Sequence, residues 1–174
     1  MSETAGNSLE RMLGLLDLFS VDQPVWSTEA MMQATGSTRS TCYRYLKVLQ
    51  AAGFLTPVAQ GAYILGPRII ELDRQQRLRD PIYMAGGPPM KQLASRTGHS
   101  TLLCMLYSDT VMCVREEISP NAPAGLFSRG QKRPLFHGAA SKVIMAHLPP
   151  HQLRNLYAKQ TVIVAQAGLG EDWP

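Results

Sequence analysis

The sequence predicts an α+β chain, in which a helical head with one β-hairpin precedes a linker helix and a second domain of mixed helices and strands. Three observations support the head. A Gly-Ser turn at residues 36–37 comes first. A stripe at i, i+3, i+4 and i+7 follows, the spacing of a helix packed on a core, and consists of Cys42, Tyr45, Leu46 and Leu49. Two strand patterns, 54–58 and 62–65, then flank residues 59–61. Turn, helix and hairpin in this order predict a winged helix-turn-helix over residues 1–66.

The first helix of this head is predicted from Ser8 to Phe19, with Asn7 or Ser8 as its N-cap. Its expected buried stripe consists of Leu9, Met12, Leu13, Leu16 and Phe19. Residues 22–24, Asp-Gln-Pro, break the helix, and Trp26 is expected to anchor the core.

Two helices follow on either side of the turn. The expected N-cap of the first is Ser27, and its end is Gly36, which can adopt the positive φ of a sharp turn. We expect it to bury Ala30, Met31 and Ala34. The second begins at Ser37 or Thr38 and ends near Ala52, before Gly53.

Residues 67–80 predict a linker helix that is solvated on most sides, and residues 81–174 form the predicted second domain. The run Gly-Gly-Pro-Pro at 86–89 predicts a hinge, with Pro88 or Pro89 in the first turn of a helix ending at Thr97. The other predicted elements are a hairpin, a strand interrupted at residues 130–133, and two helices: 100–107, 111–118, 126–136, 139–148 and 152–158.

The charge distribution favours a nucleic-acid partner. The net charge of +4 and the pI of about 9.1 are only mildly basic. However, no Asp or Glu occurs between Glu29 and Glu71, whereas four basic residues do: Arg39, Arg44, Lys47 and Arg68. Basic residues on one helix face in an acid-free stretch are an electrostatic footprint for nucleic acid. The alternative is a chance gap in the acidic residues.

The polar face of the helix after the turn is the expected contact with double-stranded operator DNA. Arg39, near the helix N-terminus, is best placed for a base edge, whereas Arg44 and Lys47 are expected to contact phosphates. Thr41 either donates to a phosphate or caps and packs its own helix. The full set of expected DNA contacts is Thr38, Arg39, Ser40, Thr41, Tyr43, Arg44, Lys47, Gln60 and Gly61. The competing interpretation is a solvated helix face; Tyr45 and Tyr63 are expected to pack inside.

Cysteine and histidine usage favours a chain without metal or other cofactor. The three cysteines are an odd number without C-x-x-C spacing, which disfavours a disulfide framework and a zinc site. No signal peptide and no apolar run near 18 residues is present, so we expect a cytoplasmic protein without a membrane partner. A Cys–His hydrolase using His137 with Cys104 or Cys113 is a remote alternative, because no nucleophile motif surrounds either cysteine; we expect no enzyme.

Several motifs together resemble one family, the bacterial transcriptional regulators of the isocitrate-lyase-regulator (IclR) type. In the head these are Ser8–Arg11, Ser40–Leu46, Leu49–Leu55 and Tyr63–Arg68, and in the second domain Leu93–Gly98 and Gly138–Ala146. The resemblance covers nearly the whole chain. It implies a dimeric or tetrameric regulator, a repressor or an activator, with a GAF-like domain that binds a small and often carboxylate-bearing effector.

The best candidates for the effector are Ala139 and Ala140, since small residues at a helix N-terminus let backbone N–H groups approach a carboxylate. Ordinary close packing is the alternative for both. Leu126 and Leu135 are candidates for the apolar side of the pocket, with core packing as the competing role.

Two departures from the family pattern stand out. The family's Gly-Lys-Ala helix start is Ser141-Lys142-Val143 here, and the chain stops at Pro174, where the family continues into a helix and several strands. We therefore expect a truncated product with a partial effector domain. The alternative function is a DNA-binding and dimerisation fragment, with Ile69 and Leu72 as dimer contacts and no working effector response.

Overall fold

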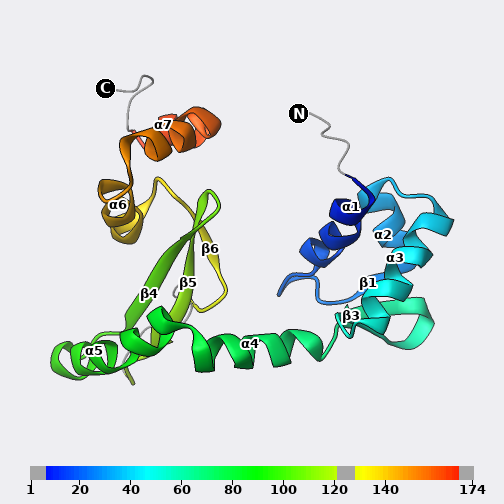
Figure 1. Ribbon diagram of the computed structural model, residues 1–174, viewed down its shortest axis with the longest axis horizontal. Coiled ribbons are helices and arrows are strands. Elements are labelled where there is room, and N and C mark those ends of the chain that lie inside the picture. Colours follow the sequence, from blue (N-terminus) through cyan, green and yellow to red (C-terminus); the bar gives the residue numbers. More distant parts are fainter. Residues whose placement is uncertain (1–6, 121–127, 169–174) are drawn as a thin grey trace. The chain divides into compact units, whose positions relative to one another are not determined.

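The computed structural model describes residues 7–120 and 128–168 and divides the chain into two compact units, the first ending at Leu78 and the second beginning at Arg79 (Figure 1). It confirms the predicted α+β fold. The first unit contains α1 (Ser8–Gly14), a 3₁₀ turn (Leu16–Leu18), β1 (Trp26–Ser27), α2 (Thr28–Thr35), α3 (Arg39–Ala51), β2 (Leu55–Pro57), a second 3₁₀ turn (Ala59–Gly61) and β3 (Ala62–Leu65). The division falls within α4 (Arg68–Arg79).

The core of the first unit lies under α3. The predicted stripe of Cys42, Tyr45, Leu46 and Leu49 is confirmed, since none of the four is more than 5% exposed. Leu15, Met31 and Leu55 complete the buried cluster, and Tyr63 packs against it as expected. One face of α3 is therefore fully used in holding the unit together, which leaves the opposite face to solvent.

The prediction of a first helix to Phe19 is wrong, because α1 ends at Gly14 and a 3₁₀ turn follows. Glycine is a poor helix former, and the tighter turn directs Leu15 into the core. Leu15 is 1% exposed, while Leu9 and Leu13 of the predicted stripe are 65% and 55% exposed. Of the two proposed caps, Asn7 is the one used, in a reciprocal capping box with Glu10.

The capping of α2 was predicted correctly. The Ser27 hydroxyl accepts from the Ala30 N–H at 3.1 Å, and Gly36 has φ 63° at the C-terminal end. The predicted burial of Ala34 is wrong: Ala34 is exposed and Ala30 only half-buried, and the buried residues of α2 are Thr28 and Met31. With eight residues, α2 has a single narrow buried face.

The wing is a three-stranded antiparallel sheet in the order β1-β3-β2. The predicted strands at 54–58 and 62–65 are present, the first shortened to β2. The additional strand β1 consists of two residues, with Trp26 opposite Tyr63, and has no periodicity of its own. Trp26 is half-buried and packs against the core cluster.

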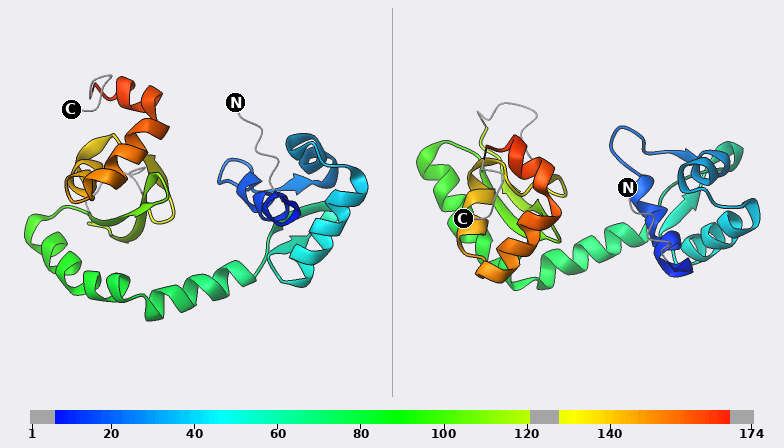
Figure 2. Two further views of the ribbon diagram at one scale, coloured as in Figure 1. Left: turned by 45° about the horizontal axis from the view of Figure 1, so that its top comes forward. Right: turned by 90° about the horizontal axis from the view of Figure 1, so that it is seen from above.

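The second unit is an antiparallel sheet with helices on both faces. Its elements are α5 (Pro81–Thr97), β4 (Thr101–Tyr107), β5 (Thr110–Glu117), β6 (Lys132–Pro134), α6 (Gly138–Ala146), α7 (Pro150–Lys159) and α8 (Thr161–Gln166). The strand order is β4-β5-β6. Figure 2 shows the orange and red helices of this unit on the side of the strands away from the green α5. A cluster including Val111, Leu135 and Tyr157 joins the sheet to α7 and α8.

Two predictions in this unit need correction, and one helix was not predicted. The hinge at 86–89 is wrong, because α5 runs unbroken from Pro81 to Thr97 through Pro88 and Pro89. Its glycines serve close packing instead: a Cβ on Gly86 would lie 2.9 Å from Leu103 Cδ2, and one on Gly87 would lie 2.7 Å from the Arg115 guanidinium. The interruption predicted at 130–133 is also partly wrong, because β6 already begins at Lys132. The helix α8 was not predicted.

The hairpin of β4 and β5 follows the prediction, but its register shifts once. Leu103 pairs with Arg115 and Cys104 with Cys113, so that Val114 is left over as a β-bulge. The bulge allows Arg115 to face α5 while Cys113 lies beside Cys104 on the other face of the sheet. None of the helices among the described residues is both long and apolar enough to span a membrane.

Candidate nucleic-acid interface

The N-terminus of α3 is fixed by two threonine hydroxyls. Thr38 is the N-cap, and its Oγ1 accepts from the Thr41 N–H at 3.4 Å and donates to Thr41 Oγ1 at 3.0 Å. The Thr41 hydroxyl thus takes part in the cap as an acceptor, and its own hydrogen stays available to a phosphate, so both roles that the sequence suggested are compatible with this geometry. The turn between α2 and α3 is therefore held by Gly36 on one side and Thr38 on the other.

The face of α3 opposite the core is polar, basic and exposed. This face consists of Ser40, Tyr43, Arg44 and Lys47. Arg39, the first residue of the helix, is also exposed. The Arg39 guanidinium lies 5.6 Å from the centroid of the Tyr43 ring, a distance at which a cation and a ring attract. Among the described residues, no ion pair joins Arg39, Arg44 or Lys47 to a carboxylate.

The tip of the wing also exposes the predicted residues. Gln60 has φ 60° and Gly61 has φ 69°, and both are exposed. The buried hydroxyl of Thr28 donates to the Gly61 carbonyl at 3.2 Å and so ties the tip to α2. Sequence reasoning missed Thr28, and a single threonine after an N-cap carries no signal of a contact 33 residues further along the chain.

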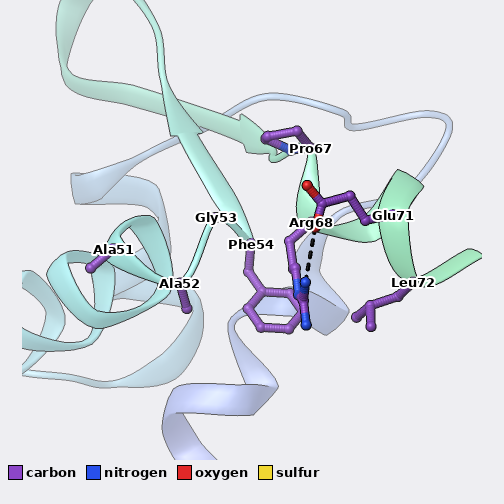
Figure 3. Close-up of a pocket in the computed structure, with 8 residues that line it drawn as sticks. All are labelled: Ala51, Ala52, Gly53, Phe54, Pro67, Arg68, Glu71 and Leu72. Carbon is purple, nitrogen blue, oxygen red and sulfur yellow. Dashed lines mark hydrogen bonds and ion pairs between the residues drawn. The ribbon is translucent and has the colours of Figure 1, made fainter.

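A hollow of about 660 Å³ lies where α4 leaves the wing (Figure 3), and Ala51, Ala52, Gly53, Phe54, Pro67, Arg68, Glu71 and Leu72 line it. Arg68 forms an ion pair with Glu71 at 2.9 Å, and its N–H donates to the Gly53 carbonyl at 3.1 Å. A Cβ on the buried Gly66 would overlap the Gly53 carbonyl oxygen. These contacts explain how the start of α4 is fixed beside the end of α3.

The predicted effector residues occupy different environments. Ala139 and Ala140 are exposed in the first turn of α6, where His137 is the N-cap residue but makes no side-chain capping bond. Leu135 is 0% exposed within the core cluster. Its contacts are those of the competing role, core packing. Leu126 lies outside the described residues.

The cysteines of the hydrolase alternative lack the lowered pKa of an activated catalytic nucleophile. Burial raises the pKa of the Cys104 thiol, and burial followed by the charges of Cys104 and Glu116 raises the pKa of Cys113 to about 11. A thiol rather than a thiolate is therefore the main form at neutral pH, whereas the thiolate is the nucleophile.

Comparison with known proteins agrees with this geometry. Residues 8–59 match the family model described as the IclR helix-turn-helix domain, and residues 78–167 match that of the bacterial transcriptional regulator IclR C-terminal. The HTH-type transcriptional regulator KipR of Bacillus subtilis is 26% identical over 164 residues, which cover 94% of this chain and 64% of KipR. The chain thus spans less than two thirds of the length of this curated relative.

Solved structures share the fold. An IclR family transcriptional regulator from Brucella abortus matches with a TM-score of 0.77 at 17% identity, covering 95% of this chain and 63% of the other. An IclR homologue from Microbacterium hydrocarbonoxydans, solved in complex with 4-hydroxybenzoate, matches with a TM-score of 0.71 at 20% identity, covering 89% and 65%.

Proposed function

Because the chain belongs to the IclR family of bacterial transcriptional regulators, we propose that it binds operator DNA through the exposed face of α3 and the tip of the wing. In this proposal Arg39 reads a base edge from the start of the helix. Arg44 and Lys47 contact phosphates, and the backbone at Gln60 and Gly61 meets a further phosphate.

The observation that carries this proposal is the division of α3 into two faces. Its stripe of Cys42, Tyr45, Leu46 and Leu49 is used in the core, while its exposed cations have no carboxylate partner among the described residues. Neighbouring cations on a solvated face repel one another, whereas contact with phosphates releases counterions and supplies essentially all of the non-specific affinity for DNA and a large share of the specific affinity. A solvated structural face needs no such concentration of one sign of charge.

A homodimer is the proposed binding unit, since a single head buries too little surface for operator affinity and two heads can read two half-sites. Exposed apolar side chains support it. Leu9 and Leu13 on α1 and Ile70 on α4 are 55–73% exposed, and Leu72 is 37% exposed. Contact with a second copy would remove these side chains from water.

The second unit is the proposed receptor for a small carboxylate-bearing effector, with the first turn of α6 as the binding element. The N–H groups at a helix N-terminus attract anions, and the small side chains of Ala139 and Ala140 leave those groups accessible. Calorimetric titration of the 174-residue chain with 4-hydroxybenzoate, the ligand of the Microbacterium relative, is a direct test. Binding that Ala140→Asp weakens would support it, and binding unchanged by that substitution would contradict this placement.

The proposed DNA binding is tested by a salt-series titration of the same chain against its own upstream intergenic DNA and a scrambled duplex. Tight, salt-sensitive binding that prefers the intergenic duplex is expected. Lys91→Ala is a matched control, because Lys91 is an exposed lysine on α5 in the second unit. Equal weak binding to both duplexes, or the same loss in Lys91→Ala as in Lys47→Ala, would contradict the proposal.

A further inference from the structure

Two cysteines face each other across the hairpin of the second unit. Cys104 on β4 and Cys113 on β5 are direct partners in the antiparallel ladder. Both backbone groups of Cys113 bond on the opposite side: its N–H donates to the Gln131 carbonyl at 3.1 Å, and its carbonyl accepts from the Gly130 N–H at 2.8 Å. Cys104 and Cys113 are therefore a non-hydrogen-bonded pair, the type in which opposing Cα atoms approach to about 4.5 Å.

That separation is within the range of about 4.4–6.8 Å that a disulfide bridges. The side chains also point the same way, because residues directly opposite each other in an antiparallel pair lie on one face of the sheet. Cys104 packs on that face against the cluster under α7 and α8. The thiol of Cys113 donates on its own strand, to the Arg115 carbonyl at 3.3 Å. Cys113 is fully buried, whereas Cys104 is half-buried and so is the sulfur that solvent reaches.

We propose that Cys104 and Cys113 form an oxidisable dithiol, which closes to a cross-strand disulfide when a small-molecule disulfide is the oxidant. In the first step the small fraction of Cys104 that has lost its proton attacks the oxidant as a thiolate, forms a mixed disulfide and releases one small thiolate, which takes up the proton. In the second step the Cys113 sulfur attacks Cys104 Sγ and releases the other. The protein loses two protons and two electrons, and the oxidant takes up both in becoming two thiols.

The surroundings of the pair determine this order. Burial raises the pKa of both thiols, but the positive charge of Arg133 opposes the rise at Cys104. At Cys113 a backbone hydrogen bond with Arg115 opposes the rise, but the pKa still reaches about 11, and the thiol donates to the Arg115 carbonyl at 3.3 Å. Cys104 is therefore the attacking sulfur and Cys113 the resolving one.

The third cysteine is an internal control. Cys42 is fully buried in the other unit, among the apolar side chains of the core under α3. Overall loss of structure would expose Cys42 to the oxidant, whereas oxidation of the folded protein would spare it.

The test is to incubate the reduced, folded chain with oxidised glutathione, remove the oxidant, block the remaining thiols with N-ethylmaleimide in denaturant, and map chymotryptic peptides without reduction. Tyr107 lies between the two cysteines, so chymotrypsin can separate them. We expect peptides containing Cys104 and Cys113 to be joined by a disulfide, in the unmodified chain and in Cys42→Ala, with Cys42 of the unmodified chain alkylated. Cys113→Ala is expected to retain glutathione on Cys104, and Cys104→Ala to leave Cys113 alkylated.

Full alkylation of both cysteines in the folded chain, after conditions that oxidise a simple dithiol, would overturn the proposal. A lasting glutathione adduct on the unmodified chain, or cross-links that involve Cys42, would also overturn it. The result does not depend on how the variants fold, because the map of the unmodified chain already decides between these outcomes.

Discussion

Arginine has opposite roles in the two units. On α3, Arg39 and Arg44 are exposed and have no carboxylate partner among the described residues. In the second unit, Arg115 is 17% exposed and donates to the Tyr83 carbonyl and to Glu117 Oε1, each at 2.9 Å. Donors that are used inside the protein are unavailable to a ligand. The comparison therefore separates a structural arginine from those that have donors left for DNA.

The surroundings of Arg115 show how the structural arginine is held. Its guanidinium lies 4.7 Å from the centroid of the Tyr83 ring, and Arg129 lies 5.7 Å from the same ring. Gly87 leaves the space that the guanidinium occupies beneath α5. These contacts hold α5 against β5. Arg115 therefore stabilises this packing, whereas apolar side chains stabilise the packing under α3.

The first prediction has the largest expected effect and removes the contacts of Arg115 with Tyr83 and Glu117. Arg115→Met keeps an unbranched apolar stem but leaves Glu117 and the Tyr83 carbonyl without their donor, which we expect to cost about 3 kcal/mol of unfolding free energy. Urea denaturation followed by circular dichroism measures the change. Arg39→Met is the matched control and is expected to stay within about 0.5 kcal/mol. Equal destabilisation by the two substitutions would remove the distinction between the two kinds of arginine.

The second prediction concerns the arginine proposed to read a base. Arg39→Ala is expected to cost about 1–3 kcal/mol in binding to the preferred operator and to change the order of preference among operator variants. The measurement is a competition titration with duplexes that differ at single base pairs. If affinity falls equally for every duplex, Arg39 contacts phosphate rather than a base.

The sequence predicted α3 well because one spacing decides both of its faces. Cys42 and Leu49 are buried and Arg44 and Lys47 are exposed because a helix of period 3.6 separates them, whatever it packs against. The turn of the wing at residues 59–61 could also be predicted, because the two strand patterns that flank it are local features of the sequence. The proposed DNA-contact residues belong to these local patterns, which is why the sequence alone was enough to propose them.

Features that depend on distant partners could not be predicted. β1 exists only through its pairing with β3. The Gly-Gly-Pro-Pro run resembles a hinge locally, but Gly86 and Gly87 are explained by Leu103 and Arg115 on the strands beneath them. The contacts of Arg115 and Arg129 with Tyr83 were missed for the same reason, since the three residues come from β5, the segment before β6 and α5.

The third prediction concerns the close packing of Gly87 against the Arg115 guanidinium. Gly87→Ala places a methyl group 2.7 Å from the Arg115 guanidinium, so the flexible arginine must shift and its two hydrogen bonds lengthen. We expect a loss of about 1–2 kcal/mol of unfolding free energy. Gly14→Ala is the control, because its added Cβ would have nothing within 4 Å and a helical glycine gains about 0.5 kcal/mol on replacement by alanine. A loss in both variants would point to a general effect of losing glycine.

The fourth prediction has the smallest expected effect and concerns Lys47, an exposed cation of α3. Lys47 lies on the exposed face of α3 in its second half, away from the helix N-terminus where bases are read. A lysine in that position is expected to neutralise one phosphate and to read no sequence. Lys47→Ala should therefore weaken binding to all duplexes alike and reduce the slope of log K against log salt by about one. Because the loss is the same for every duplex, the ratio of specific to scrambled affinity should stay constant while both titrations shift. A change in that ratio would place Lys47 at a base edge, and unchanged affinity in both Lys47→Ala and Arg39→Ala would show that DNA binds another surface.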